Sequence, residues 1–140
     1  MTACVPHQAG CVAIDGRAIL IEGEPGSGKS WLALTLIDRG AELVADDGLI
    51  LEARHGQLFA RPHPNIAGLI EVRNLGLLPM PALVEAVVAL VLVLDSDAPR
   101  FIEAPEQCER NGVALPLIRL DAPLAIKAEL ALTRFGLRAP

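Results

Sequence analysis

The sequence predicts an α/β fold in which a mixed β-sheet is packed with helices around a phosphate-binding loop. Residues 23–30 read Gly-Glu-Pro-Gly-Ser-Gly-Lys-Ser, a complete G-x-x-x-x-G-K-[ST] pattern. This phosphate loop lies between the apolar run Ala18–Ile21 and a helical pattern that begins at Ser30. In addition, 52% of the 140 residues are hydrophobic and only 3% are aromatic, which is typical of an aliphatic interior built from sheet and helix.

A β-hairpin leads the chain into the phosphate loop. Residues 11–14 and 18–22 are apolar and extended, and the Asp15-Gly16 pair between them favours a tight turn. After the loop, residues 30–39 predict a helix that ends at Gly40. Its apolar residues lie nearly all round, so we expect it to be packed on both sides.

The rest of the chain predicts further strands and one more helix. Prolines and Gly68 indicate a loop-rich middle over residues 62–81, and we expect Asp121 to cap the last helix. The predicted elements are a short buried strand at 43–45, a hairpin pairing 49–52 with 57–61, buried strands at 87–94 and 115–120, and a helix at 124–135 ended by Gly136.

Composition excludes several classes of function. The net charge is −5 with no basic stripe, which argues against nucleic-acid binding. Three cysteines without C-x-x-C spacing argue against a disulfide framework or a zinc site and fit a reducing cytosol. Residues 1–7 lack the features of a signal peptide, and the most apolar stretch, residues 82–94, contains Glu85 and is too short to span a membrane. We therefore expect one cytoplasmic domain over residues 1–140, with no membrane or nucleic-acid partner.

The phosphate loop predicts nucleotide binding. Backbone N–H groups wrap a polyphosphate when glycines allow positive φ and close approach, and the following helix N-terminus favours negative charge. Lys29 is expected to reach the β- and γ-phosphates, and the Ser30 hydroxyl to bind Mg²⁺. We read the acidic neighbours Glu22 and Glu24 as tolerated charges. The predicted ATP-binding residues are Gly23, Glu24, Pro25, Gly26, Ser27, Gly28, Lys29 and Ser30.

Two acidic sites compete for the role beside the phosphates. Asp46-Asp47 follows the strand at 43–45, so one carboxylate could accept a proton from an attacking hydroxyl while the other holds Mg²⁺. Asp95 ends the apolar run Val91–Leu94, the form of the strand that holds Mg²⁺ in most P-loop NTPases. The sequence leaves both open.

Three segments together resemble the HPr serine kinase/phosphorylase family. They are the phosphate loop, Leu43–Asp47 one helix later, and Gly68–Gly76, which contains an apolar-Glu-apolar-Arg-x-x-Gly run that generic P-loop proteins lack. The resemblance covers most of the chain as the family's catalytic C-terminal domain in its short single-domain form. It implies an HPr kinase/PEP carboxykinase-like fold, ATP and Mg²⁺ as cofactors, and phosphorylation of a serine on the phosphocarrier HPr of the phosphotransferase system.

The resemblance also assigns roles to residues. Asp46 would be the catalytic base, Ser30, Asp47 and Glu71 would serve the metal, and Arg73 would act beside them. His7 would pair with the acidic site, and the chain would form a homo-oligomer, which the resemblance implies is a hexamer. Longer members carry a basic loop before the last helix that serves the phosphorylase direction. Residues 117–123 hold a single arginine here, which favours the kinase direction.

Two other functions fit the same residues. A small-molecule kinase or generic P-loop NTPase would use Asp95, and a nucleotide-sensing module would bind without transfer. Glu71 and Arg73 favour the protein-serine kinase. Alternation along Leu69–Arg73 would place both side chains on one face of an extended segment, with Ile70 and Val72 on the other.

Overall fold

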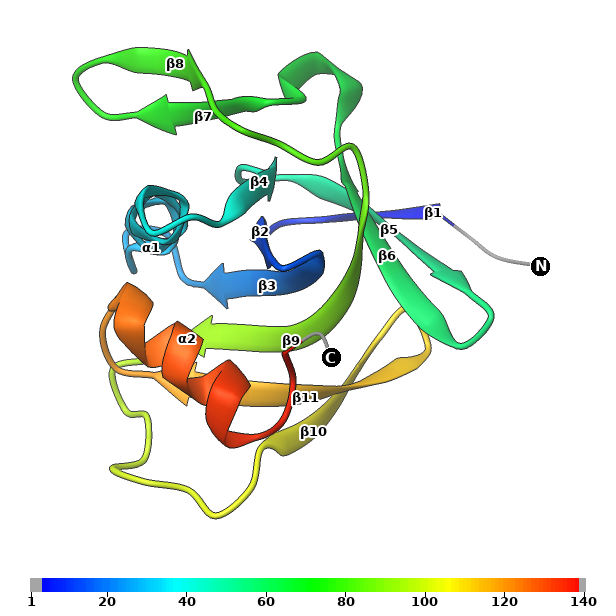
Figure 1. Ribbon diagram of the computed structural model, residues 1–140, viewed down its shortest axis with the longest axis vertical. Coiled ribbons are helices and arrows are strands. Elements are labelled where there is room, and N and C mark those ends of the chain that lie inside the picture. Colours follow the sequence, from blue (N-terminus) through cyan, green and yellow to red (C-terminus); the bar gives the residue numbers. More distant parts are fainter. Residues whose placement is uncertain (1–3, 139–140) are drawn as a thin grey trace.

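The structure, a computed structural model, describes residues 4–138, in which nine strands form one mixed sheet (Figure 1). The order is β1-β5-β6-β9-β3-β2-β4, with β11 beside β9 and β10 beside β11. The strands of this sheet are β1 (Cys4–His7), β2 (Gly10–Ile14), β3 (Arg17–Gly23), β4 (Glu42–Ala45), β5 (Leu49–Arg54), β6 (Gln57–Pro62), β9 (Ala86–Leu94), β10 (Glu106–Arg110) and β11 (Val113–Leu120).

The centre of the sheet positions the phosphate loop. β2 and β3 form the predicted hairpin, and Asp15 and Gly16 take positive φ values of 52° and 79°, as a tight mirror-type turn requires. β3 then runs parallel to β9, and β9 runs parallel to β11. Because parallel strands end at the same edge, the phosphate loop after β3 lies beside the segments that follow β9 and β11.

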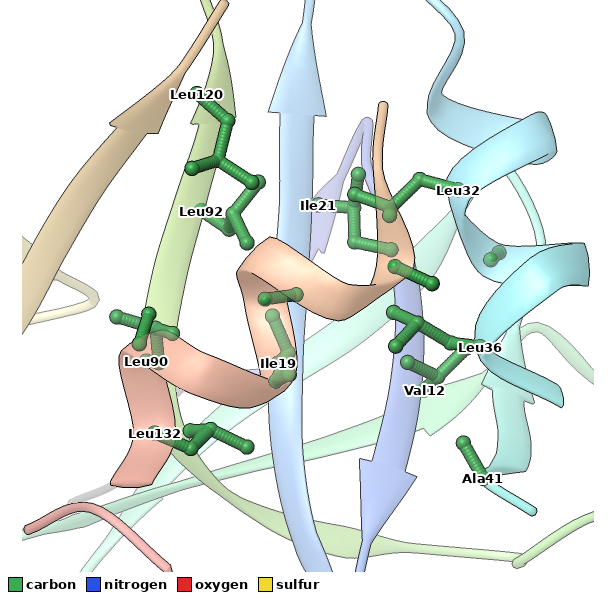
Figure 2. Close-up of a cluster of buried hydrophobic side chains, with 14 of the residues drawn as sticks. Val12, Ile19, Ile21, Leu32, Leu36, Ala41, Leu90, Leu92, Leu120 and Leu132 are labelled. Carbon is green, nitrogen blue, oxygen red and sulfur yellow. The ribbon is translucent and has the colours of Figure 1, made fainter. Parts of the chain in front are cut away.

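Two helices cover one face of these strands, α1 (Lys29–Asp38) and α2 (Ala125–Arg134). Figure 2 shows the core between them: Ile19 and Ile21 of β3 and Leu92 of β9 point toward Leu36 of α1 and Leu132 of α2, and all five side chains are fully buried. Each such side chain contributes roughly 1.5–3 kcal/mol by leaving water. This core fixes the start of α1, and with it the phosphate loop, on the sheet.

A second core fills the opposite face. Leu20 of β3 and Val91 of β9 contribute to it, together with Leu51 of β5 and Leu58 of β6. Successive residues of a strand point to opposite faces, so β3 is apolar without alternation because both of its faces are covered. The predicted mixed sheet packed with helices is therefore confirmed.

The loop-rich middle contains more structure than expected. A 3₁₀ turn (η1, Pro64–Ile66) leads into a separate antiparallel hairpin of β7 (Leu69–Val72) and β8 (Gly76–Pro79), which extends beyond α1 in Figure 1. Ile70 anchors β7 in the core under α1 and is fully buried. The many prolines and glycines of this segment shape turns around a short sheet rather than replacing it.

One prediction about the helices needs correction, and one is confirmed. Asp121 does not cap α2: the N-cap is Leu124, with no side-chain cap, and the Asp121 carboxylate instead accepts a hydrogen bond from Lys127 Nζ at 3.1 Å. Helix α1 contacts the sheet, α2 and β7, as the all-round apolar pattern predicted, but Trp31 is 60% exposed. In residues 4–138, neither helix is long and apolar enough to cross a bilayer.

Candidate active site

The phosphate loop adopts the backbone that its glycines predicted. Gly26 and Gly28 have φ values of 81° and 102°, and Gly28 is the N-cap of α1. The first helical hydrogen bond runs from Leu32 N–H to Gly28 O at 2.9 Å, so the amides of the preceding helical residues have no acceptor within the helix. These donors, together with the helix dipole, favour an anion at this position.

The loop has the form of a cradle for phosphate. A Cβ atom at Gly23 would lie 2.6 Å from Ser27 Oγ, and a Cβ atom at Gly28 would lie 2.8 Å from Pro123 Cγ, so neither position accommodates a side chain. Within residues 4–138, Ser27 Oγ is buried and has no hydrogen-bond partner. A buried hydroxyl without a partner is costly, and a phosphate oxygen would satisfy it. The residues present therefore fit a polyphosphate.

Lys29 is directed back onto the loop. Its Nζ donates to the backbone oxygens of Gly23 at 2.9 Å and Glu24 at 3.4 Å. Carbonyl oxygens are weaker partners for an ammonium group than phosphate oxygens are. Lys29 is thus placed where it can exchange these bonds for the phosphates of a nucleotide.

Three elements converge on Asp46 next to the loop. Ser30 Oγ at the start of α1 donates to Asp46 Oδ1 at 3.2 Å, and the backbone N–H of Glu71 in β7 donates to Asp46 Oδ2 at 2.9 Å. The Glu71 amide is free to do this because Glu71 pairs with Leu77 of β8, which lies on the other edge of β7. β4 holds Asp46 in place through its backbone pairing with β2 and with the segment at Pro81–Leu83.

The surroundings of Asp46 raise the pKa of its carboxyl group. Partial burial is the main cause, and the negative charges of Asp47 and Glu71 act in the same direction, while the hydrogen bonds from Glu71 and Ser30 oppose it. A carboxylate with a raised pKa accepts protons more readily than an ordinary one, which suits a general base.

The other residues that the sequence predicted to act beside Asp46 have exposed side chains. Asp47 is exposed and has a positive φ of 48°. Glu71 is exposed on the face of β7 opposite the buried Ile70, as the alternation predicted. Arg73 is exposed in the turn between β7 and β8, and its guanidinium makes no hydrogen bond or ion pair within the described chain. Ser30, Asp46, Asp47 and Glu71 are called the Asp46 side below.

His7 does not pair with the acidic site as the resemblance implied. Its Nε2 lies 2.8 Å from Glu22 Oε2, on the strand that leads into the loop. Arg110 at the end of β10 donates to the same carboxylate through Nε at 2.9 Å and Nη2 at 2.7 Å. Burial opposes ionisation of Glu22, but the hydrogen bonds from Arg110 and His7 outweigh it and lower its pKa to about 2.

Sequence reasoning missed this cluster of His7, Glu22 and Arg110. Glu22 was read as a tolerated charge, whereas the structure makes it the centre of an ion pair between strands that are far apart in the chain. The Asn111-Gly112 pair is a hairpin signal that could have revealed β10, because both residues have positive φ, but it would not have identified the partner of Arg110.

A pocket of about 780 Å³ lies on the opposite side of the phosphate loop. It is lined by Glu22–Ser27, Val93–Asp97 and Asp121. Asp95, the competing metal residue, accepts hydrogen bonds from Arg119 Nη1 at 3.2 Å and from the Asp97 N–H at 2.9 Å. Val93–Asp97 and Asp121 are called the Asp95 side below. The structure thus separates the two acidic candidates across the loop.

Within residues 4–138, no three His, Cys, Asp or Glu side chains gather in a geometry that would hold a metal ion by themselves. Magnesium commonly binds through one or two protein oxygens together with substrate phosphates and water, so an all-protein cage is not required for it. The Ser30 hydroxyl beside Asp46 supplies oxygen ligands of the type that Mg²⁺ prefers.

Comparison with known proteins identifies relatives of the chain. The model of the HPr Serine kinase C-terminal domain matches residues 2–87, more than half of the chain. The HPr kinase/phosphorylase of Streptococcus thermophilus is 34% identical over 122 residues, covering 78% of this chain and 40% of the relative. That of Clostridium tetani is 44% identical over 72 residues, covering 51% of this chain and 24% of the relative. The chain therefore spans about a quarter to two-fifths of the length of these relatives.

A solved structure is similar over nearly the whole chain. The Hpr(Ser) kinase/phosphatase from Coxiella burnetii superposes with a TM-score of 0.80 at 28% sequence identity, covering 93% of this chain and 96% of that one. The match covers a larger share of the chain than the family model, which ends at residue 87 near the start of β9.

Proposed function

The chain belongs to the HPr serine kinase C-terminal domain family, and we propose that it transfers the γ-phosphoryl group of ATP to a serine of an HPr-like phosphocarrier protein. The observation that carries this proposal is the convergence of Ser30, Asp46 and the Glu71 amide at the mouth of the phosphate loop. Generic P-loop proteins need the loop, but the contact from the third segment to Asp46 joins all three of the segments on which the resemblance rests.

The proposed reaction assigns one role to each group. The backbone of residues 23–30 and Lys29 hold the phosphates, and Asp46 accepts the proton of the substrate serine as its oxygen attacks the γ-phosphorus. The bond from the γ-phosphorus to the bridging oxygen breaks, and ADP leaves. Mg²⁺, which Ser30, Asp47 and Glu71 would hold, supplies neutralisation of charge on the phosphate oxygens. Arg73 is proposed to stabilise negative charge on the transferring group.

His7 is not assigned a catalytic step in this proposal, because its ring pairs with Glu22 and not with Asp46. Asp95 is also not the preferred metal residue, because its carboxylate is already bonded to Arg119 and to the Asp97 amide. These contacts favour the protein-serine kinase over an NTPase that would use Asp95.

The proposal extends to the setting of the reaction. Residues 1–140 are proposed to act as one catalytic domain in the cytoplasm, within a homo-oligomer that family resemblance suggests is a hexamer. Light scattering on the purified chain tests the oligomeric state. The forward direction is proposed, because residues 117–123 before α2 hold a single arginine in place of a basic loop.

The decisive experiment combines the purified protein with ATP, Mg²⁺ and the HPr proteins of its host. Mass spectrometry should locate one phosphoserine on an HPr protein, and Asp46→Asn should abolish it while ATP still binds. Transfer to no HPr protein, with ATP bound normally, would support a nucleotide-sensing module instead. ATP hydrolysis that depends on Asp95 and not on Asp46 would support a generic NTPase.

A further inference from the structure

The two sides of the phosphate loop restrict how a nucleotide can lie in it. Ser30 at the start of α1 is bonded to Asp46, so the phosphate that is transferred must point toward the Asp46 side. β4, which ends at Asp46, and β9, which ends before Asp95, flank the β3–β2 hairpin from opposite sides in the sheet. A nucleotide held in this orientation would leave the loop with its other end over the C-terminal ends of β9 and β11, on the side away from Asp46.

A pocket of suitable size lies on that path. Its volume of about 780 Å³ falls within the roughly 300–1,000 Å³ of small-molecule sites. The first half of the phosphate loop, from Gly23 to Ser27, forms one wall, and Val93–Asp97 forms the other. The buried Ser27 hydroxyl that lacks a partner lies in the same wall. The pocket is thus continuous with the phosphate cradle.

The charge of this pocket suits a nucleoside better than a phosphate. Its lining includes the acidic residues Glu22, Glu24, Asp95, Asp97 and Asp121. Carboxylates repel phosphate oxygens, but they accept hydrogen bonds from the hydroxyl groups of a ribose. The carboxylates of Glu22, Asp95 and Asp121 are bonded to Arg110, Arg119 and Lys127, respectively. The Asp97 carboxylate has no hydrogen bond or ion pair within the described chain.

From these observations we propose that the nucleoside of ATP occupies the pocket on the Asp95 side, and that Asp97 selects a ribonucleotide by accepting hydrogen bonds from its ribose hydroxyls. This inference rests on the proposed function, because the Asp46 side must be the end where transfer occurs. It gives the Asp95 side a role in recognition, whereas the competing NTPase hypothesis would give it a role in metal binding.

Calorimetric titration with ATP, 2′-deoxy-ATP and inorganic tripolyphosphate tests the inference. Ser96 is exposed in the turn between Asp95 and Asp97, so Ser96→Trp should fill the pocket without disturbing the core. We expect this variant to bind ATP at least roughly tenfold more weakly, because the nucleoside contacts are lost, and to bind tripolyphosphate as the wild type does. The matched control is Leu75→Trp in the exposed turn on the Asp46 side, where Leu75 is 70% exposed; it should bind both ligands normally.

Asp97→Ala provides a second test that does not depend on filling the pocket with a large side chain. The wild type should prefer ATP over 2′-deoxy-ATP, and this variant should lose that preference, with ATP affinity falling by about tenfold. Equal ATP affinity in the wild type and Ser96→Trp, or weakening by Leu75→Trp alone, would overturn the inference while leaving the proposed function intact. A wild-type protein that binds neither ATP nor tripolyphosphate would overturn both.

Discussion

Asp46 and Asp95 both follow strands that end near the phosphate loop, yet their surroundings differ. Asp46 accepts hydrogen bonds from a hydroxyl and an amide, and has Asp47 and Glu71 as negative neighbours. Asp95 faces the guanidinium of Arg119, which also binds Glu106. Partial burial, with the neighbouring negative charges as a smaller cause, raises the pKa of the Asp46 carboxyl group, whereas the Asp95 carboxylate is bonded to a cation.

This difference separates two functions that a sequence pattern cannot separate. Proton acceptance is expected of Asp46, where no cation competes for the carboxylate within the described residues. Recognition is expected on the Asp95 side, where a pocket opens and the loop from Asp95 to Asp97 is held by its own hydrogen bond.

Lys29→Ala should remove both ATP binding and phosphoryl transfer, because the Lys29 charge neutralises phosphates whichever side the nucleoside occupies. The fold should persist, since the ammonium group contacts only backbone oxygens of the loop. Titration calorimetry and circular dichroism measure the two properties. Normal nucleotide affinity in a folded Lys29→Ala protein would contradict the assignment of residues 23–30 as the phosphate site.

Asp46→Asn should lower the rate of transfer by roughly 10²–10⁴-fold, the usual contribution of a general base, and leave ATP affinity nearly unchanged. Asp95→Asn, the matched change on the other side, should lower the rate by less than about tenfold. Single-turnover transfer to the HPr protein compares the two variants. If Asp95→Asn proves the more damaging, the comparison between the sides is reversed and a conventional NTPase is favoured.

The raised pKa of Asp46 also predicts a pH dependence. The folded protein binds this proton more tightly than the unfolded chain does, so the ionised Asp46 carboxylate destabilises the fold above its folded pKa. Asp46→Asn should therefore match or exceed the wild type in melting temperature at pH 7, although it is inactive. The rate of wild-type transfer should fall as pH drops toward the raised pKa. A melting temperature clearly below that of the wild type at pH 7 would argue that Asp46 is structural.

Glu71→Gln and Arg73→Ala should each lower transfer by at least about tenfold, which corresponds to a loss of only ~1.4 kcal/mol in the transition state. Melting temperatures should shift little, because both side chains are exposed. Leu77→Ala, on the residue directly opposite Glu71 in the hairpin, is the matched control and should leave the chemical step unchanged. Wild-type rates of transfer in both variants would show that the β7–β8 hairpin takes no part in the chemical step.

Much of the fold could be predicted because its signals are local. The phosphate loop, α1 and the β2–β3 hairpin each depend on residues within one turn or one strand of each other, and all three form where the pattern places them. The contact between Ser30 and Asp46 follows from the same signals, since one helix and one strand separate the two residues.

The errors arose where the chain offered competing signals. Prolines and glycines in residues 62–81 obscured β8, whereas the alternation along Leu69–Arg73 already indicated the extended segment that forms β7. At Asp121 a good capping residue lies too far from α2, which begins at Ala125, so its carboxylate binds Lys127 instead. In both places tertiary packing outweighed local propensity.

The cluster of His7, Glu22 and Arg110 could not be predicted, because 88 residues separate Glu22 from Arg110. Its members come from β1, β3 and β10. β1 leads into the β2–β3 hairpin, which brings His7 to Glu22, whereas β10 reaches Glu22 only through the long-range pairing of β10 with β11, β11 with β9 and β9 with β3. Two opposite charges so far apart in the chain leave no periodic pattern in the sequence from which their contact could be predicted. The resemblance to the family assigned His7 to the catalytic site from its position along the chain, which does not identify Glu22 as its hydrogen-bond partner.

The smallest expected effect on transfer comes from this cluster, in which Glu22 directly precedes the phosphate loop. Within the described chain, none of its three side chains forms a hydrogen bond with Asp46 or Asp95. Arg110→Met removes two charge-assisted hydrogen bonds from a partly buried carboxylate and should lower the melting temperature by several degrees. Transfer at a temperature where the variant is folded should stay within about threefold of the wild type, because the nucleotide contacts of the loop are backbone groups and Lys29.

The pH dependence of stability identifies the cause. Because the pKa of Glu22 is lowered to about 2 in the folded protein, its contribution is fully present above the ordinary pKa of 4.5 and is lost as pH falls from there toward 2. The melting-temperature difference between the wild type and Arg110→Met should therefore be largest near neutral pH and shrink in acid. A difference that stays constant down to pH 3 would indicate that Arg110 stabilises the sheet through the packing of its aliphatic stem and not through the ion pair.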